Sequence, residues 1–300
     1  MRVVLGATGN TGSVVANSLL AKGLEVRAFG RSVERLKALA AKGAKPFVGD
    51  VADSAALTEA FRGAKAAYVM IPPDMKSEDY RAYQDRITEA IGKAVEKSRI
   101  EHVVSLSSIG ADKPDKTGPV VGVQRLEQRL NRISGLNVLH IRAGYFMENT
   151  LAQVGIIKAI GMAAGPLRPD LKLPMIATRD IGAVAAEALL RLNFHQRQTC
   201  ELLGQRDLDM TEAASIIGKA IGKPDLQYSL FPDDKLRPAM TQMGTSENVT
   251  NLLLEMSAAL NSGYMLPLEQ RTPRNTTPTT FETFVAEEFV PLYNWESAAA

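Results

Sequence analysis

The sequence predicts an α/β protein in which a doubly wound parallel sheet is joined to a smaller, mostly helical C-terminal lobe. Through the first half of the 300-residue chain, short apolar segments rich in β-branched residues alternate with helical patterns. Such alternation is typical of a parallel sheet covered by helices on both faces. After about residue 145 the pattern loosens and prolines become frequent. We therefore predict a sheet domain at residues 1–145 and, at residues 146–300, a dependent lobe for a substrate or a partner.

The first predicted unit is a strand, a glycine-rich turn and a helix. Residues 2–5 form a short apolar run, the turn "GATGNTG" follows, and apolar residues then recur at helical spacing. In such a unit Gly6 permits a tight turn, Gly9 lets the backbone approach a pyrophosphate, and Gly12 lets the helix pack on the strand. The spacing is G-x-x-G-x-x-G rather than G-x-G-x-x-G, so a turn without a ligand is the alternative. We predict a Rossmann-type dinucleotide site at Gly6, Thr8, Gly9, Asn10, Thr11 and Gly12.

The second predicted strand, residues 25–29, is followed by Gly30, Arg31 and Ser32. The adenosine ribose of a dinucleotide lies at this point of the fold, where an acidic residue would bind the 2′-hydroxyl of NAD. An arginine there favours a 2′-phosphate instead, because the guanidinium forms paired, charge-assisted hydrogen bonds with phosphate. The sequence thus predicts a preference for NADP(H) over NAD(H). The alternative is that Arg31 is a solvated residue at the start of a helix over residues 33–41.

The remaining elements continue the alternation. Strands are predicted at residues 45–48, 66–71, 102–107 and 137–141. Helices are predicted at residues 54–61, 78–97 and 119–132, and a last one at 281–289. The looser second half would cover the ends of the strands, where open α/β sheets bind their ligands.

Charge and composition exclude some classes of function. The chain has 35 Lys and Arg against 33 Asp and Glu, a net charge of +2, and no basic run, so we expect no binding to nucleic acid. The three histidines have no Cys or Asp cluster beside them, and we expect no metal site.

Cysteine use and hydropathy bear on the compartment. A single cysteine, Cys200, rules out an internal disulfide and suits a reducing compartment, and its apolar surroundings favour a core residue over a reactive thiol. There is no run of about 18 apolar residues, and the chain opens on a strand pattern rather than a signal peptide. We expect no membrane contact and a cytoplasmic location.

Several motifs in order then point to a family. The sequence resembles the NmrA-like branch of the atypical short-chain dehydrogenase/reductases, whose members include NADPH-dependent quinone and dye reductases and NADP-sensing regulatory proteins. The likeness continues through residues 200–224 and so covers most of the chain. The motifs that carry it are "GATGNTG", "GRS", "GDVAD" at 49–53, "SLSSIGAD" at 105–112, "IRAGYFMEN" at 141–149 and "TRDIGAVAAEAL" at 178–189.

The resemblance implies roles for further residues of the cofactor site. Asp50 and Val51 would contact the adenine, and Ile71 and Pro72 would line the path from the ribose to the nicotinamide. Asp50 is equally well interpreted as a turn or cap residue, although Asp53 is also placed to cap the next helix.

The resemblance also implies an acceptor pocket beside the nicotinamide. Tyr145 would lie near the nicotinamide, and the pocket would be formed by Met75, Ser107, Phe146 and Asn149. The aromatic pair Tyr145 and Phe146 is also compatible with the core. Ser107 is also compatible with a role in satisfying backbone groups at a strand end.

The tyrosine and lysine that serve as proton donors in most short-chain dehydrogenases are missing. None of the seven tyrosines is followed four residues later by lysine, and Val121 and Arg125 stand where that pair is expected. Some family members place a lysine or histidine four residues before the glutamate of this helix, but here Val123 precedes Glu127. The catalytic residues therefore stay unassigned. Reduction of quinones or similar conjugated electrophiles is favoured over ketone chemistry, because their anionic products are resonance-stabilised and water can protonate them.

Two functions remain open at this point. The first is an NADPH-dependent reductase of a small flat acceptor, and the second is a non-catalytic NADP(H) sensor that regulates a partner protein. The acceptor, the partner and the oligomeric state are not specified by these residues.

Overall fold

The computed structural model describes residues 1–298, and a seven-stranded sheet forms its centre. The strand order is β10-β6-β5-β4-β1-β2-β3, and all six pairs are parallel. The strands are β1 (Arg2–Val4), β2 (Val26–Gly30), β3 (Lys45–Val48), β4 (Ala66–Val69), β5 (His102–Ser108), β6 (Asn137–Ala143) and β10 (Arg197–Leu202).

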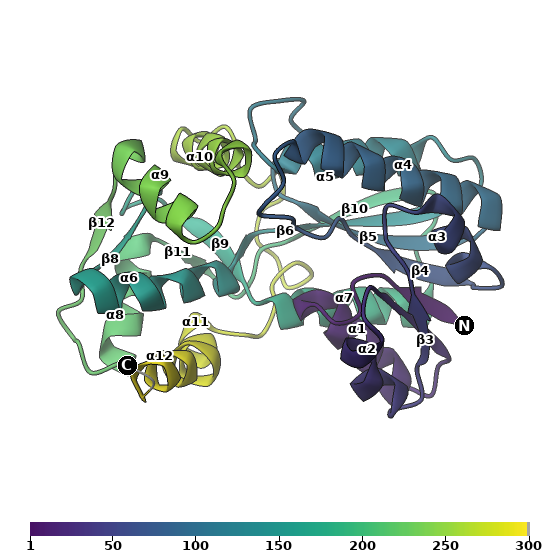
Figure 1. Ribbon diagram of the computed structural model, residues 1–300, viewed down its shortest axis with the longest axis horizontal. Coiled ribbons are helices and arrows are strands. Elements are labelled where there is room, and N and C mark those ends of the chain that lie inside the picture. Colours follow the sequence, from purple (N-terminus) through teal and green to yellow (C-terminus); the bar gives the residue numbers. More distant parts are fainter. Residues whose placement is uncertain (299–300) are drawn as a thin grey trace.

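Helices cover both faces of this sheet, as Figure 1 shows. Helices α3, α4 and α5 form one layer, while α1, α2 and α7 lie on the opposite face. Their bounds are α1 (Asn10–Ala21), α2 (Val33–Ala40), α3 (Ser54–Phe61), α4 (Tyr80–Ser98), α5 (Val120–Asn131) and α7 (Thr178–Arg191). The predicted doubly wound α/β class is confirmed.

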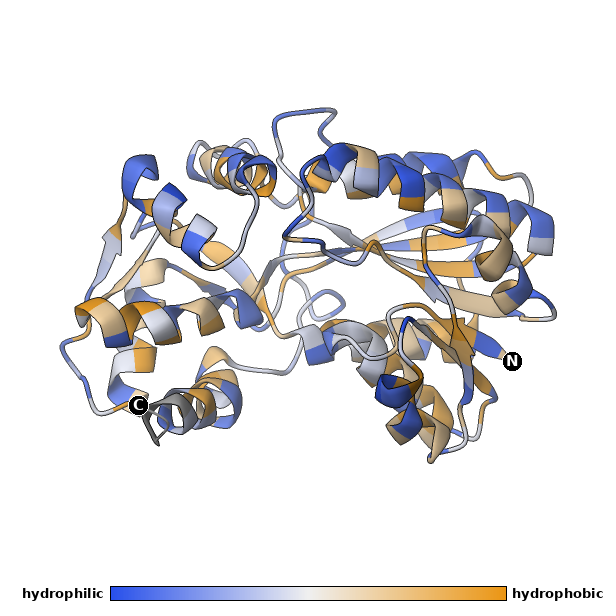
Figure 2. Ribbon diagram, in the orientation of Figure 1, coloured by the Kyte–Doolittle hydropathy of each residue, from blue (hydrophilic) through white to orange (hydrophobic). Residues whose placement is uncertain are grey.

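Side chains on each strand alternate between the two helical layers. Val3 and Leu5 join the core beneath α3, α4 and α5, whereas Val4 joins the core beneath α1, α2 and α7. Figure 2 shows hydrophobic residues gathered along the central strands and hydrophilic residues on the outer sides of the covering helices. The continuous apolar runs of the sequence follow from this burial on both faces.

The direction of the winding reverses between β1 and β4. The chain moves outward from β1 to β2 and β3, then returns to place β4 on the other side of β1. At such a point the loops that follow the two adjacent strands run to opposite faces of the sheet. They leave a crevice between them, outside the carboxyl ends of the strands. The glycine turn after β1 opens into this crevice.

The sheet also takes two elements from beyond residue 145. Helix α7 packs on α1, and β10 pairs with β6 in register from Arg197 opposite Val138 to Leu202 opposite Ala143. The chain thus leaves the Rossmann part for the lobe, returns to it, and leaves again. A boundary at residue 145 does not divide the structure cleanly, because the strand that completes the sheet is supplied by a segment distant in sequence.

The C-terminal lobe is mostly helical, with two small sheets of order β11-β9-β7 and β12-β8. Its strands are β7 (Tyr145–Phe146), β8 (Ala163–Gly165), β9 (Leu173–Ile176), β11 (Asp207–Leu208) and β12 (Tyr228–Leu230). Its helices are η1 (Met147–Ala152), α6 (Gln153–Ile160), α8 (Met210–Ala220), α9 (Asp233–Gln242), α10 (Glu247–Asn261), α11 (Phe281–Phe284), η2 (Val285–Phe289) and α12 (Val290–Ala298).

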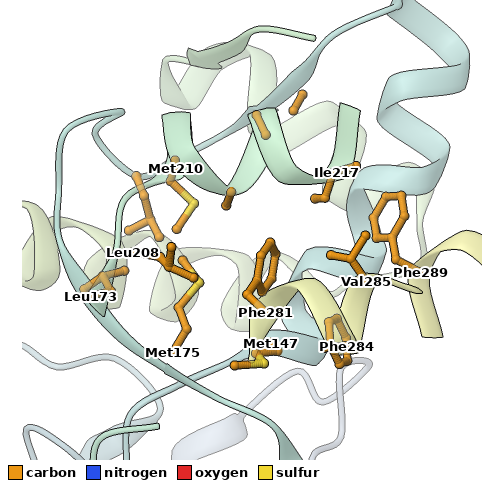
Figure 3. Close-up of a cluster of buried hydrophobic side chains, with 14 of the residues drawn as sticks. Met147, Leu173, Met175, Leu208, Met210, Ile217, Phe281, Phe284, Val285 and Phe289 are labelled. Carbon is orange, nitrogen blue, oxygen red and sulfur yellow. The ribbon is translucent and has the colours of Figure 1, made fainter. Parts of the chain in front are cut away.

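The lobe has a hydrophobic core of its own. Met147, Met175 and Leu208 meet Phe281 and Phe284 there, as Figure 3 shows. The last helix predicted from the sequence, at 281–289, contributes the two phenylalanines and continues as η2 and α12. Within residues 1–298, no helix combines the length and the apolar character that crossing a membrane requires.

Candidate active site

The glycine turn after β1 is shaped by close backbone contacts. Gly6 has a φ of +61°, and the N–H of Gly9 donates to its carbonyl at 2.8 Å. A Cβ on Gly12 would lie only 2.2 Å from the Gly6 carbonyl oxygen. The first position needs the left-handed conformation that glycine adopts without cost, and Gly12 leaves no room for any side chain. The helix therefore starts directly against the turn.

The N-terminus of α1 is open to an anion. Gly9 is the N-cap, its position has no side-chain cap bond, and the first turn holds no acidic residue. The first N–H groups of a helix have no partner inside it, and the helix dipole adds a partial positive charge there. Thr8 and Asn10 reach the surface beside this end, whereas Thr11 is buried and accepts a hydrogen bond from the Tyr68 hydroxyl at 2.8 Å. Thr11 thus fixes the helix to β4.

Two arginines flank the end of β2. Arg31 is exposed and makes no hydrogen bond or ion pair within residues 1–298, and Arg35 is likewise exposed in the first turn of α2. The Ser32 hydroxyl caps this helix by accepting from the Arg35 N–H at 3.3 Å. Glu34, in the same turn, pairs with Lys37 at 2.6 Å. Within the described residues, the end of β2 thus presents two unpaired guanidinium groups, those of Arg31 and Arg35, whereas the sequence motif indicated Arg31 alone.

Asp50 and Asp53 have separate roles. Asp53 caps α3 by accepting from the N–H groups of Ala55 and Ala56 at 2.8 and 3.2 Å, while Asp50 accepts from the Ala52 N–H at 2.9 Å. Asp50 is therefore an exposed turn residue at the carboxyl end of β3, free to face a ligand.

Val51 follows β3, whereas Ile71 and Pro72 follow β4. Val51 and Ile71 are mostly buried in the core beneath α3 and α4. The Pro72 carbonyl accepts a hydrogen bond from the Tyr83 hydroxyl at 2.9 Å. Tyr83, which sequence reasoning missed, lies close enough to Arg31 and Asp50 for both to influence the pKa of its phenol, which burial raises. It thus connects the ends of β2 and β3, near Arg31 and Asp50, with the loop after β4.

An apolar cavity of about 230 Å³ lies where β5 and β6 end against the lobe. Tyr145, Phe146 and Asn149, which the resemblance assigned to the site, are among the residues that line it. Lys172 is the charged residue of the lining within the described chain, and it pairs with Asp209 and Glu212 at 2.9 and 3.2 Å. The rest of the lining is formed by Ser108, Ile109, Ala143, Gly144, Leu173, Pro174, Met256, Leu260, Met265, Leu266 and Pro267.

Ser107 does not line this cavity. It is 3% exposed, and its hydroxyl donates to Glu127 Oε1 at 2.6 Å. The same carboxylate binds Arg142 through two hydrogen bonds of 2.9 and 2.6 Å. Alternation along β5 turns Ser107 toward α5 and leaves Ser108 to face the cavity, which corrects the predicted pocket position.

Met75 also lies outside the cavity lining. Its side chain is 41% exposed, and its carbonyl accepts from the Ser246 N–H at 2.9 Å. The Ser246 hydroxyl donates to the Ser77 carbonyl at 2.6 Å. Met75 thus contributes a backbone contact between the loop after β4 and the start of α10, the helix that supplies Met256 and Leu260 to the cavity.

Tyr145 is held firmly at the junction of sheet and lobe. Strand β7 pairs with β9, opposite Met175, and a Cβ on the preceding Gly144 would lie 2.3 Å from the Pro174 carbonyl oxygen. Burial raises the pKa of Tyr145 to about 12, and hydrogen bonding with Asn149 opposes the rise. The phenol is therefore protonated at neutral pH and acts as a hydrogen-bond donor.

Val121 and Arg125 occupy the positions at which the family resemblance leads us to expect a tyrosine–lysine pair. Val121 is buried, and Arg125 forms two hydrogen bonds with Asp85 at 2.8 and 2.6 Å. Val123 packs between the sheet core and the lobe core. This face of α5 is structural.

Thiol chemistry and metal binding would need other kinds of site. Cys200 is half-buried in β10, and burial raises the pKa of its thiol. Residues 1–298 contain no group of three His, Cys, Asp or Glu side chains that could hold a metal ion.

Comparison with known proteins identifies the class. The model of the NmrA-like family matches residues 2–289, and the chain belongs to this family. It is 28% identical over 280 residues to an NAD(P)H azoreductase of Xenophilus azovorans, covering 92% of this chain and 93% of that protein.

Solved structures share the fold. The NADPH complex of the quinone oxidoreductase QOR2 from Escherichia coli superposes with a TM-score of 0.80 at 23% identity, over 96% of this chain and 100% of the other. A Citrobacter triphenylmethane reductase bound to NADP(H) gives a TM-score of 0.76 at 17% identity, over 96% and 100%.

Proposed function

We propose that the protein is an NADPH-dependent reductase that transfers a hydride to quinones or similar conjugated electrophiles. The observation that carries the proposal is the apolar cavity at the carboxyl ends of β5 and β6, at the same edge of the sheet as the uncapped N-terminus of α1. The azoreductase and quinone oxidoreductase relatives support the same class of reaction.

The cofactor would lie across the carboxyl ends of the strands. Its pyrophosphate would rest on the turn from Gly6 to Gly12, where N–H groups and the helix dipole favour an anion. Its adenosine would lie near Asp50 and Val51, and the path along Ile71 and Pro72 would bring the nicotinamide toward Tyr145.

A preference for NADPH rests on the charges at the end of β2. Arg31 and Arg35 are free to bind a 2′-phosphate, and Glu34 is engaged by Lys37. No carboxylate stands directly after β2, where one would bind the ribose of NAD.

Hydride transfer to such an acceptor requires of the protein mainly that it position the acceptor against the nicotinamide. Bound NADPH supplies the hydride, and the cavity residues hold the acceptor flat against it. The neutral phenol of Tyr145 and the amide of Asn149 offer hydrogen bonds to an acceptor oxygen, whereas the Ser108 hydroxyl already donates to the Ile109 carbonyl at 2.9 Å. The anion formed from a quinone is delocalised and takes its proton from solvent, so a buried Val121 is compatible with turnover.

The test is NADPH consumption by the purified protein across quinones, conjugated aldehydes and cationic dyes, with NADH in parallel. Turnover with at least one acceptor, faster with NADPH, is the expected result. Tight NADPH binding without reduction of any acceptor would instead favour a redox sensor that regulates a partner protein. The cytoplasmic location stays a prediction.

A further inference from the structure

A second, smaller cavity lies behind Tyr145. Its volume is about 40 Å³, and Tyr145 is the residue that it shares with the lining of the larger cavity within residues 1–298. Its phenol hydrogen-bonds with Asn149 of the larger cavity and lies near enough to Tyr228 of the smaller one to interact with it electrostatically. The rear cavity is lined further by Thr150, Gln153, Ala163, Gly165, Pro166, Leu167, Met210, Ala213, Ala214, Ile217 and Tyr228.

The polar groups of the rear cavity already have partners. The Tyr228 hydroxyl donates to the Leu167 carbonyl at 3.0 Å, and the Thr150 hydroxyl donates to the Met147 carbonyl at 2.7 Å. The Gln153 amide exchanges two hydrogen bonds of 3.0 Å with the backbone of Ala164. A guest in this space would meet satisfied polar groups and apolar surface, so the space suits a hydrocarbon substituent.

The backbone at Tyr145 cannot easily move aside. Pairing of β7 with β9 and the close approach of Gly144 to Pro174 fix the chain on both sides of the residue. The residue that the two linings share is thus held in place by its backbone, and its side chain is the part that a substitution would change.

We propose that Tyr145 is a specificity-determining residue whose ring sets how long an acceptor the site admits. The larger cavity, here called the front cavity, holds flat acceptors that have no long substituent. A long apolar substituent that would extend into the rear cavity is blocked by the Tyr145 ring. The proposal rests on the proposed function, in that the front cavity takes the acceptor.

The experiment compares Tyr145→Ala with Tyr145→Phe, which keeps the ring and removes only the hydroxyl. For each protein, kcat/KM is measured with a 1,4-naphthoquinone bearing no substituent and with one bearing a linear pentyl chain. Tyr145→Ala should raise the pentyl-to-unsubstituted ratio by at least about tenfold, since placing even one methylene in an apolar pocket contributes about this much discrimination. Tyr145→Phe should leave the ratio within about twofold of the unchanged protein. An unaltered ratio in Tyr145→Ala, or an equal rise in Tyr145→Phe, would overturn the proposal.

A second substitution tests the location of the new space. Ala214 lines the rear cavity and is buried in the lobe core. Adding Ala214→Leu to Tyr145→Ala should refill the space and return the ratio toward its original value. A ratio that stays high would contradict the proposal. Tyr145→Leu serves in place of Tyr145→Ala if the latter fails to fold, with a smaller rise expected.

Direct binding keeps this test distinct from that of the proposed function. Equilibrium dialysis of the same two quinones in the presence of NADP⁺ gives a ratio of dissociation constants that needs no turnover. If no variant reduces a quinone while the binding ratio still shifts in Tyr145→Ala, the reductase function fails and the role of Tyr145 stands. If turnover occurs and neither ratio shifts, the role of Tyr145 fails alone.

Discussion

Gly12 illustrates how a single missing side chain shapes a binding site. The turn "GATGNTG" departs from the usual glycine spacing, yet its last glycine lies directly against the carbonyl of its first. This contact explains why the helix can begin so close to β1 and point its N–H groups into the crevice.

Substitution of Gly12 should therefore damage both folding and cofactor binding. The Cβ in Gly12→Ala would force the turn and helix apart, which we expect to lower the free energy of unfolding by about 1–3 kcal/mol and NADPH affinity at least tenfold. Gly155→Ala is the matched control, since α6 leaves open space around that position and alanine favours a helix. Calorimetric titration and thermal unfolding measure the two effects, and equal behaviour of both variants would refute the assignment.

Arg31 carries the prediction of coenzyme preference. Arg31→Ala should weaken NADPH binding by at least tenfold while NADH binding changes little, because only NADPH has a 2′-phosphate to lose as a partner. Arg62→Ala removes an exposed arginine that pairs with Glu59 on the far side of α3 and controls for net charge. The test is to measure the dissociation constants of both variants for NADPH and for NADH. Similar losses of affinity for the two coenzymes in Arg31→Ala would show that Arg31 does not bind the 2′-phosphate.

Individual residues differ in how well sequence alone places them. The glycine turn could be predicted because its members are consecutive and its contacts are local. Ser107 could not be assigned, because its partner Glu127 is on another element and pairing depends on which face of β5 each serine occupies. Tyr83 gave no signal in the sequence, since its contacts with Pro72 and the crevice arise only from packing of α4.

At the scale of elements, Glu127 joins α5 to two adjacent strands. It receives hydrogen bonds from Ser107 of β5 and Arg142 of β6, and it is 4% exposed. Helix α5 thus serves as a structural support, because Glu127 ties it to β5 and β6.

Removal of this charge should be costly. In Glu127→Gln the buried Arg142 loses its counterion, and we expect a loss of about 3 kcal/mol in the free energy of unfolding. Glu59→Gln breaks an exposed pair with Arg62 and should cost less than about 1 kcal/mol. Urea unfolding of both variants measures the difference; similar small losses would show that Glu127 is not a structural support.

Glu201 links β10 to the segment that closes the cavity. Its buried carboxylate accepts from the N–H groups of Leu268 and Glu269, both at 2.8 Å, next to the cavity residues Leu266 and Pro267. Burial raises the pKa of Glu201, and these hydrogen bonds oppose the rise.

The raised pKa predicts the sign of a pH effect. The folded protein holds this proton more tightly than the unfolded chain, so the stabilisation is present below the ordinary glutamate pKa and is lost as pH rises through the raised value. Glu201→Gln should thus reduce the fall in unfolding free energy on going from mildly acidic to neutral pH. Chemical unfolding at a series of pH values measures this slope, with Glu59→Gln as the exposed control; an unchanged slope in Glu201→Gln would contradict the prediction.

For the whole molecule, the sheet and the lobe are interleaved rather than sequential. Strands and helices up to β6 were predicted within a few residues, because each is a local pattern of apolar residues. The place of β10 was not predicted, because pairing with β6 joins segments that are far apart in the chain. The contribution of α10 to the cavity, through Met256 and Leu260, was not predicted either, because it also depends on contacts between segments far apart in the chain.

Interleaving predicts that residues 1–145 do not fold alone. Without α7 and β10, the fragment would expose the apolar face of α1 and an unpaired edge of β6. We expect the fragment to lack cooperative thermal unfolding by circular dichroism, whereas the full chain unfolds in one transition. A fragment with a sharp transition would support an independent first domain.

The late return of β10 also affects how the protein is made. Each paired residue of β6 leaves the ribosome 59 residues before its partner in β10 does, a delay of roughly 3–12 s at ordinary rates of translation. During that interval the backbone N–H and C=O groups on the edge of β6 are unpaired, and apolar side chains lie next to them. An exposed strand edge of this kind promotes association between nascent chains. Yield in a cell therefore depends on protection of this edge during synthesis as well as on the stability of the finished fold.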